Sequence, residues 1–260
     1  MPEVIKLRKA GWPWLLSVIR YNNKLNEIKN KLGFSDDNTI CFDMMELVDL
    51  DIYNASNDFK KLYEDAIREY LKYNPEMVCH LPYGGDSNLA TYVNLEEVMV
   101  RMKKAMDFAN QFGVKKLTLH PGSCDGTLER NEAIKLCAKN VKELCQYAKQ
   151  YDMVVMLENL IGDAELMRTP EEYFELKSLI DEPNLKFIFD VAHFHASKFD
   201  NGNVEGILDF VEKTKEDLYH LHISDNDGNR DMHVAIGVGN IDFKTYFKKL
   251  DEVGYKGLFS

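Results

Sequence analysis

The sequence is poor in the features that mark secreted, membrane-bound and modular proteins. It contains five cysteines, an odd number, and none of them forms a C-x-x-C pair. Its longest early apolar run, residues 12–19, is far shorter than the roughly 18–20 residues of a membrane-spanning helix. No signal-peptide core follows the first charged residues, and no stretch rich in Pro, Gly or Ser marks a linker. We therefore expect a reduced, cytoplasmic protein with no membrane partner.

The sequence also lacks an excess of positive charge. Its 43 acidic residues outnumber its 32 Lys and Arg residues, which gives a formal net charge of −11. An acidic protein has little non-specific affinity for nucleic acid or for an anionic membrane, although a bound metal ion can supply positive charge at one site. The sequence has neither a P-loop nor a G-x-G-x-x-G motif for phosphate binding. Charge alone therefore weighs against a role in DNA binding.

The sequence does contain a regular alternation of strand-like and helix-like segments. Short β-rich runs recur from residue 77 onward, and patterns with helical spacing separate them. The predicted strands are residues 77–83, 114–120, 153–159, 185–193 and 218–224. Alternation of this kind is typical of parallel βαβ units, in which each helix connects two neighbouring strands of one sheet.

Two of the predicted helices carry capping signals. Asn94 and Glu97 have the spacing of a capping box, and Gly113 is placed to end the same helix. Another helix is predicted to begin at Thr169–Pro170, with the threonine as N-cap and the proline in the first helical position.

The two ends of the chain complete the count of strands. Residues 25–34 predict a helix and residues 39–47 the second strand, so the first strand is expected earlier, within residues 14–19. The last six residues, Y-K-G-L-F-S, have the pattern of an eighth strand that is cut off at the terminus.

This count predicts an α/β fold of the TIM (β/α)8 type whose last strand is truncated and whose final helix is missing. A barrel of this kind typically needs about 250 residues, so we expect a single domain over residues 1–260. The role of residues 1–23 is left open.

Residues that can bind metals stand at the ends of the predicted strands. They follow one another at intervals of 32 to 40 residues, which is about the length of one βα unit. Parallel strands of a barrel bring such residues to the same end, where (β/α)8 enzymes build their active sites. The loop after the seventh strand adds a D-x-H pair. The candidate ligands are His80, His120, Glu158, Asp190, His193, His222, Asp231 and His233.

These residue types favour a metal centre. Imidazole and carboxylate groups bind Zn²⁺, Mn²⁺ or Fe²⁺ when they converge within about 2.0–2.2 Å of the ion. Eight ligands are too many for one tetrahedral ion, so two or three ions that share Glu158 or Asp190 as a bridge are expected. Each residue also has a simpler interpretation, because a lone histidine can be structural, Asp190 can cap a helix and Glu158 can pair with a lysine. His195 and His220 are expected to support the site or the core without direct ligation.

The ordered motifs resemble one superfamily of TIM barrels. Over roughly residues 77–258 the chain is similar to the xylose-isomerase-like superfamily, which includes sugar phosphate isomerases and epimerases and endonuclease IV (AP endonuclease family 2). The motifs are H-L-P-Y at 80–83, L-H-P-G at 119–122, L-E-N at 157–159, D-V-A-H at 190–193, H-I-S-D at 222–225, D-M-H at 231–233 and G-V-G-N-I-D at 237–242.

The resemblance implies different metal centres in the two branches. The endonuclease IV branch implies a trinuclear zinc cluster held by all eight candidate ligands. The sugar branch implies one divalent ion held by Glu158, Asp190 and His222, together with a final glutamate from the eighth strand. That glutamate usually follows G-Y-x-G by a few residues, whereas this sequence stops at G-Y-K-G-L-F-S. The N-terminal A-G-W-P-W-L-L-S also differs from the first-strand segment of endonuclease IV.

The leading hypothesis is a divalent-metal-dependent isomerase or epimerase that acts on a small sugar or sugar phosphate through an enediolate. Glu158 is the candidate proton-transfer group, and Arg230 is the candidate contact for a substrate phosphate. One alternative is an endonuclease IV-like zinc phosphodiesterase that cuts DNA at abasic sites, which the ligands outside the sugar branch's set favour. Another is a metal-binding barrel that is inactive because the final glutamate is absent. The expected cofactor is one to three ions of zinc or manganese, and the oligomeric state is left open.

Overall fold

The computed structural model describes the chain from residue 56 onward, apart from two short gaps. It also describes two short strands before residue 56. The described residues are 10–11, 44–47, 56–71, 76–199 and 203–260. The helix expected at 25–34 and the first strand expected within 14–19 lie outside them. Among the described residues the first strand is Ala10–Gly11, and the second strand is described only from Met44.

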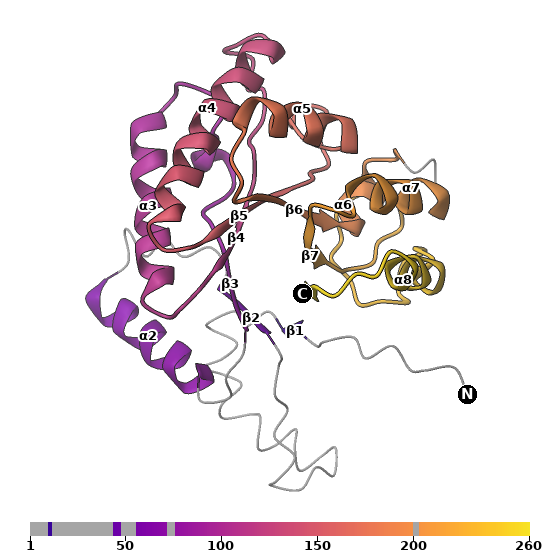
Figure 1. Ribbon diagram of the computed structural model, residues 1–260, viewed down its shortest axis with the longest axis horizontal. Helices are drawn as coiled ribbons and strands as arrows, with labels where there is room; N and C mark the ends of the chain where they lie inside the picture. The colour runs from indigo at the N-terminus through magenta and orange to yellow at the C-terminus, as the bar shows by residue number, and fades with distance from the viewer. Residues whose placement is uncertain (1–9, 12–43, 48–55, 72–75, 200–202) are drawn as a thin grey trace, which may run out of the picture.

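Eight parallel strands form one sheet in the order in which they occur in the chain. They are β1 (Ala10–Gly11), β2 (Met44–Leu47), β3 (Glu76–His80), β4 (Lys116–Leu119), β5 (Val154–Glu158), β6 (Leu185–Asp190), β7 (Leu218–His222) and β8 (Leu258–Phe259). Each strand pairs with the next one along the chain, and the sheet bends into an arc (Figure 1). The parallel (β/α)8 architecture predicted from the alternation of segments is confirmed.

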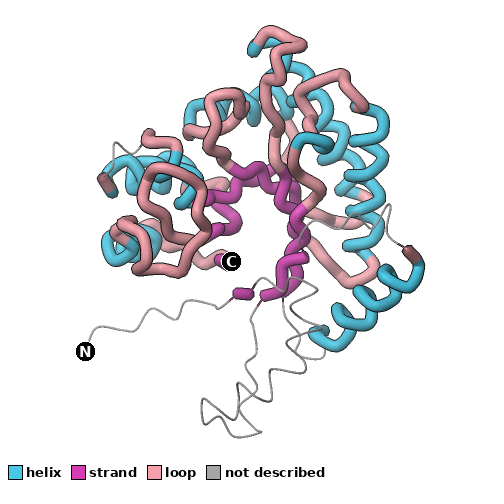
Figure 2. The backbone as a smooth tube through the Cα atoms, turned by 180° about the vertical axis from the view of Figure 1, so that it is seen from behind, coloured by secondary structure: helices cyan, strands magenta, loops and turns pink. Residues whose placement is uncertain are grey.

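Helices connect the strands and cover the outer face of the arc (Figure 2). They are α2 (Asn57–Leu71), the short 3-10 turn η1 (Gly85–Ser87), α3 (Leu95–Asn110), α4 (Arg130–Lys149), α5 (Pro170–Ile180), α6 (Val191–Ala196), α7 (Val204–Thr214) and α8 (Phe243–Glu252). Cys137 and Cys145 lie on the buried face of α4. None of the described helices is both long enough and apolar enough to cross a membrane.

The two predicted capping signals have different outcomes. The Thr169 hydroxyl accepts a hydrogen bond from the Glu172 amide at 3.3 Å, and the Glu172 carboxylate accepts one from the Thr169 amide at 3.2 Å. The capping box of α5 is therefore confirmed. The capping box expected at Asn94 is wrong, because Asn94 is left-handed (φ 53°) and its side chain makes no cap hydrogen bond. A side-chain cap needs extended backbone at that position to reach the amides of the first turn.

Residue alternation along the strands links the core to the mouth of the barrel. Side chains of a strand point alternately to opposite faces of the sheet. Val78, Met156 and Ile188 form a small buried cluster, separate from the main core that packs under the helices. The residues two positions further along β3, β5 and β6 are His80, Glu158 and Asp190. The same period that buries the apolar cluster therefore turns these three polar side chains inward at the carboxyl ends of the strands.

The loops that follow β3 and β4 are fastened together at Gly122. Asn88 accepts the Ser123 amide at 3.1 Å and donates to the Ser123 carbonyl at 2.8 Å. Gly122 passes so close to this contact that a Cβ atom on it would lie 2.3 Å from the Asn88 side-chain oxygen and 2.9 Å from the Leu89 amide nitrogen. Its φ of 98° also favours glycine. The close approach fixes one side of the barrel mouth.

Substitution of Gly122 tests this contact against a matched glycine four residues away. Gly126 also has a positive φ, 84°, but a Cβ there would meet nothing within 4 Å. We expect Gly126→Ala to lower the free energy of unfolding by about 1 kcal/mol from backbone strain alone. Gly122→Ala adds a collision with backbone and should cost about 2 kcal/mol more. Urea denaturation measures both, and equal losses would contradict the close approach.

Candidate functional site

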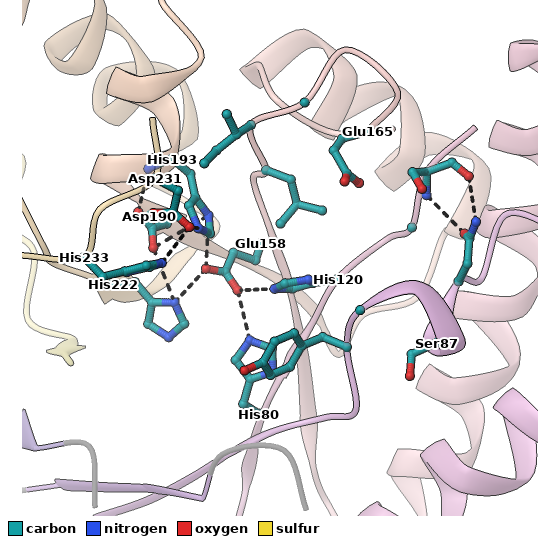
Figure 3. A pocket seen from close by; sticks show the side chains of 18 of the residues that line it. His80, Ser87, His120, Glu158, Glu165, Asp190, His193, His222, Asp231 and His233 are labelled. Atoms are coloured by element: carbon teal, nitrogen blue, oxygen red, sulfur yellow. Dashed lines mark hydrogen bonds and ion pairs between the residues drawn. The ribbon is translucent and has the colours of Figure 1, made fainter. Parts of the chain in front are cut away.

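The structure brings the eight predicted ligands together at the carboxyl end of the sheet (Figure 3). Four of them are the last residues of strands, one follows β4 directly, and one lies in the first turn of α6, which follows β6 without a loop. The D-x-H pair lies in the loop between β7 and α8. In this order they are His80, Glu158, Asp190 and His222, then His120, then His193, and finally Asp231 and His233.

Glu158 is the centre of this arrangement. Its carboxylate is 1% exposed, and four imidazole rings surround it. The Nε2 atoms of His120 and His80 lie 3.1 and 3.3 Å from one carboxylate oxygen. The Nδ1 atoms of His222 and His193 lie 2.7 and 3.6 Å from the other oxygen. Among the described residues no lysine contacts this carboxylate, so its partners are histidines, a residue type that also binds metals.

The surroundings keep Glu158 ionised. Burial by itself raises the pKa of a carboxylic acid, because it penalises the charged form. At Glu158 the charge of His222 and the hydrogen bonds from His120, His222 and His80 outweigh this penalty and hold the pKa well below its usual value. Burial lowers the pKa of His120 to about 4, although the Glu158 carboxylate opposes the shift. His120 is therefore neutral at neutral pH, as a ligand imidazole must be.

A second group of acids and histidines lies beside the first. His193 has Nδ1 3.7 Å from Asp190 and Nε2 3.7 Å from Asp231, and Asp231 lies 2.9 Å from Nε2 of His233. Burial opposes protonation of His193, but Asp190, Asp231 and Glu158 together raise its pKa to about 10. Burial and the nearby Glu158 charge raise the pKa of Asp190. For Asp231, histidine contacts overcome the effect of burial and lower the pKa.

The donor geometry fits divalent metal ions. In a tetrahedral zinc site, ligand atoms about 2.0–2.2 Å from the ion lie roughly 3–3.6 Å from one another, close to the separations described above. Three sets of residues place one donor atom each within 4.8 Å of the others. Glu158 belongs to two of these sets, and so does His193. The sets are His80 with His120 and Glu158, Glu158 with Asp190 and His193, and His193 with Asp231 and His233.

Three of the histidines also have their second ring nitrogen engaged. Nδ1 of His80 lies 2.8 Å from the Leu81 carbonyl oxygen, and Nδ1 of His193 lies 2.9 Å from the Asn159 carbonyl oxygen. Nδ1 of His233 lies 3.2 Å from the Ser224 hydroxyl. In a neutral imidazole, a hydrogen bond from Nδ1 fixes the tautomer and leaves Nε2 as the electron-pair donor, which is the usual arrangement around ligating histidines. His193, whose raised pKa keeps it protonated, would have to lose its second proton before it could bind a metal ion.

Asn159 was not singled out from the sequence, yet it orients two of the ligands. Its side-chain oxygen accepts the Asp190 amide at 2.8 Å, and its side-chain nitrogen donates to the Asp190 carbonyl at 2.9 Å. The same residue's backbone carbonyl contacts His193. The signal available in the sequence was its position directly after Glu158, where the strand ends in L-E-N.

Asp225 is the second positioning residue that was missed. It is fully buried, and its carboxylate accepts hydrogen bonds from the amides of Gly237, Gly239 and Ile241 at 2.8, 3.0 and 3.2 Å. These bonds fold the β7–α8 loop back over the barrel, which brings the D-x-H pair to the site. His233 adopts a left-handed φ of 45° in this loop. The combination of H-I-S-D with a later G-x-G contains this information, but only the fold shows that the two segments meet.

The remaining sequence candidates lie at the edge of the site or below it. Asp190 also caps α6 by accepting the His193 amide at 2.8 Å, so the simpler interpretation of this residue holds beside the metal one. His220 lies buried below the site with Nε2 3.0 Å from the Ser260 hydroxyl, and His195 contacts Asn240. Neither belongs to the three metal-capable sets. Arg230 is exposed, and it is not among the residues that line the cavity.

The ligands form the floor of a cavity of about 1080 Å³. Tyr83 covers one wall, with its ring centre 4.7 Å from that of His80 and 5.3 Å from that of His120. Among the described residues, the lining of this cavity includes neither lysine nor arginine. Beyond the metal-capable sets it includes three further acids, Asp86, Asp125 and Glu165.

Comparisons with known proteins relate the chain to sugar epimerases and to endonucleases. It is 28% identical over 194 residues to an uncharacterised protein of Methanocaldococcus jannaschii, and the matched region covers 73% of this chain and 64% of that protein. It is 24% identical over 162 residues to the fructoselysine 3-epimerase of Escherichia coli O157:H7, covering 62% and 57%. It is 29% identical over 199 residues to the probable endonuclease 4 of Thermosipho africanus, covering 70% and 67%. The chain thus spans less than two thirds of the length of the first two relatives.

Among solved structures, a D-tagatose 3-epimerase-like protein superposes with a TM-score of 0.74 and is 26% identical, covering 98% of this chain and 90% of that one. A family model described as the xylose isomerase-like TIM barrel matches residues 39–260. These matches confirm the resemblance that the strand-end motifs indicated. The chain belongs to the xylose isomerase-like TIM-barrel family.

Proposed function

We propose that this protein is a divalent-metal-dependent isomerase or epimerase that acts on a small sugar. The observation that carries this proposal is the buried Glu158 carboxylate, which lies among four imidazoles at the floor of a cavity with no lysine or arginine in its described lining. The names of two relatives, a fructoselysine 3-epimerase and a D-tagatose 3-epimerase-like protein, support the same reaction class.

The charge of the cavity favours an unphosphorylated sugar. Proteins usually bind phosphate with arginine, lysine or clustered backbone amides. Beyond the metal-capable sets, the described lining instead includes three carboxylates, which repel an anionic ligand and accept hydrogen bonds from sugar hydroxyls. Arg230 is adjacent in sequence to the lining residue Asp231, and a phosphorylated substrate would have to recruit it from its exposed position.

The three metal-capable sets are the proposed binding residues for zinc or manganese. His80, His120 and Glu158 offer two nitrogens and one oxygen, a donor set that suits either ion. The other two sets extend the centre through the shared residues Glu158 and His193. A divalent cation held there would polarise a carbonyl oxygen and the neighbouring hydroxyl. It would thereby acidify the hydrogen on the carbon that carries the hydroxyl.

Glu158 is the proposed proton acceptor. It is ionised at neutral pH, and it lines the cavity in which a substrate would bind. In an isomerisation this one group takes a proton from one carbon and returns it to the next on the same face, while a second proton moves between the two oxygens of the enediolate. Epimerisation at a single carbon needs a second donor on the opposite face. Isomerisation moves the carbonyl to the neighbouring carbon whereas epimerisation inverts one carbon, so the product distinguishes the two reactions.

Proton exchange with solvent tests this role. With Mn²⁺ or Zn²⁺ bound, the wild-type protein should incorporate deuterium from D₂O into a ketohexose next to its carbonyl, which NMR detects. Glu158→Gln should reduce the exchange rate by about a hundredfold or more, since it removes the proton acceptor. Glu143→Gln, on the outer surface of α4, is the matched control and should not change the rate. Metal content is measured for each variant.

Two outcomes of this experiment would count against the proposal. A metal-loaded wild-type protein that exchanges no carbon-bound hydrogen in a panel of ketoses and aldoses would contradict the isomerase function and favour a metal-binding barrel without turnover. A Glu158→Gln variant that retains both metal and most of the exchange would contradict the role of Glu158.

The outer set predicts a metal stoichiometry above one. Asp231→Asn should remove one ion per chain, because the amide is a weaker ligand than the carboxylate that joins His193 and His233. Asp227→Asn, an exposed acid in the same loop, is the matched control and should leave the content unchanged. Elemental analysis after dialysis gives the count. A wild-type protein with one ion per chain that Asp231→Asn still retains would show that the outer set binds none.

A second function deserves a direct test because of the same outer set. Three sets linked by shared ligands suit a multinuclear centre, and a probable endonuclease 4 is among the relatives. The absence of lysine and arginine from the described lining weighs against this alternative, since DNA binding depends on contacts between basic side chains and the backbone phosphates. Chelator-sensitive nicking of a duplex with one abasic site would reverse the ranking of the two functions.

A further inference from the structure

Two of the predicted ligands lie on a loop that is largely exposed. Asp231 and His233 belong to the β7–α8 loop, and their side chains are 36% and 47% exposed. Asp231 nevertheless lies 3.7 Å from Nε2 of His193, which is part of the buried helix α6 (Figure 3). Asp225 folds the loop back on itself, and the amides whose hydrogen bonds it accepts all belong to the loop. Other contacts must therefore hold the loop beside α6.

His195 connects α6 to both arms of this loop. Its side chain is 4% exposed, and its Nε2 atom lies 2.7 Å from the side-chain oxygen of Asn240, near the end of the loop. An amide oxygen only accepts hydrogen bonds, so the imidazole is the donor. The ring also lies against Gly228, near the start of the loop, where a Cβ atom would be 3.0 Å from Nε2. One buried imidazole thus contacts the outgoing arm and the returning arm.

Asn226 makes a second connection between the same two elements. It is fully buried, and its side-chain nitrogen donates to the Ala192 carbonyl at 2.7 Å. Its side-chain oxygen accepts the Gly228 amide at 2.9 Å, which fixes the turn that lies against the His195 ring. Ala192 and His195 lie on either side of His193 in the sequence. The two connections therefore hold the loop to α6 around the ligand that Asp231 approaches.

We propose that His195 is a positioning residue for the outer metal-capable set: through Asn240 it holds the β7–α8 loop on α6 and keeps Asp231 beside His193. This inference rests on the proposed metal-binding function of that set. His195 belongs to none of the three sets, so it acts through the loop and not as a ligand. A loop that is already in the binding arrangement binds an ion more tightly, because the apparent affinity scales with the fraction of competent molecules.

Two substitutions of His195 separate its hydrogen bond from the packing of its ring. His195→Phe keeps a ring and removes the donor, whereas His195→Gln keeps an N–H donor close to the position of Nε2. We expect His195→Phe to weaken binding of the outer ion about tenfold, as for other contacts that orient ligands, and His195→Gln to restore most of the affinity. Neither should change the affinity of the set formed by His80, His120 and Glu158. Isothermal titration of the metal-free full chain with Zn²⁺ measures both affinities, and the binding event that Asp231→Asn removes identifies the outer ion.

Substitutions of Asn240 test the same bond from the loop. Asn240 is exposed, so its substitution opens no cavity in the core. Asn240→Ala should match His195→Phe, and the double variant should be no weaker than either single variant, because both changes remove one bond. Asn240→Asp keeps the acceptor oxygen and loses only the bond donated to the Asp227 carbonyl at 3.4 Å, so it should bind the outer ion at least as tightly as the wild type. The matched control is Asn229→Ala, an exposed asparagine whose side chain bonds within the loop, and it should have no effect.

Hydrogen exchange of the metal-free protein gives a measurement that does not depend on bound metal. The amides of Val234, Gly237 and Gly239 are hydrogen-bonded to Asp225 within the loop. His195→Phe and Asn240→Ala should speed their exchange about tenfold, because the loop opens more often when it is not held on α6. Amides in the buried part of α4 should exchange at wild-type rates, which distinguishes release of the loop from a general loss of stability.

Unchanged loop exchange in Asn240→Ala, an equal loss of affinity at the inner and outer ions, or a His195→Gln variant as weak as His195→Phe would each overturn the inference. Failure of the proposed metal function gives a different result. A wild-type protein that binds no outer ion loses that function, and faster loop exchange in the variants would still show that His195 holds the loop. A wild-type protein whose outer ion is unaffected in His195→Phe and Asn240→Ala keeps the metal function and loses the role of His195.

Discussion

The buried carboxylate of Glu158 is the group on which the rest of the site depends. An ionised carboxylate at 1% exposure is unstable unless positive charge or hydrogen-bond donors surround it, and four histidines from four different elements provide them. The same requirement makes the centre suitable for metal, since a divalent cation replaces protons on imidazoles that already face the carboxylate. The side chains that stabilise this carboxylate and the side chains proposed to bind a metal are thus largely the same groups.

The barrel places these charges through the period of its strands. Val78, Met156 and Ile188 fill the interior of the sheet, and the next inward positions on the same strands are His80, Glu158 and Asp190. A shift of one residue in any strand would turn its ligand outward under the helices. The same alternation therefore packs the apolar interior and brings His80, Glu158 and Asp190 together at the ends of their strands.

The loops complete the site with contacts of a different kind. Asp225 gathers three backbone amides of the β7–α8 loop, and Asn88 fastens the β3–α3 loop to Ser123 beside Gly122. These hydrogen bonds are short and directional, so they fix the positions of the two loops that form walls of the cavity. The described part of these walls contains neither lysine nor arginine, and this is the basis for proposing a substrate without a phosphate group.

The sequence by itself determined the alternation of strands and helices, the capping box at Thr169 and the identity of the eight residues that meet at the mouth, because periodicity and spacing are properties of the chain alone. It did not determine the backbone of Asn94, where a left-handed turn replaced the expected cap. Nor did it identify Asn159 and Asp225 as positioning residues, or the exposed position of Arg230. Only the tertiary structure decided these, because each depends on which loops meet above the sheet, and loop contacts carry no repeating pattern from which their partners can be predicted.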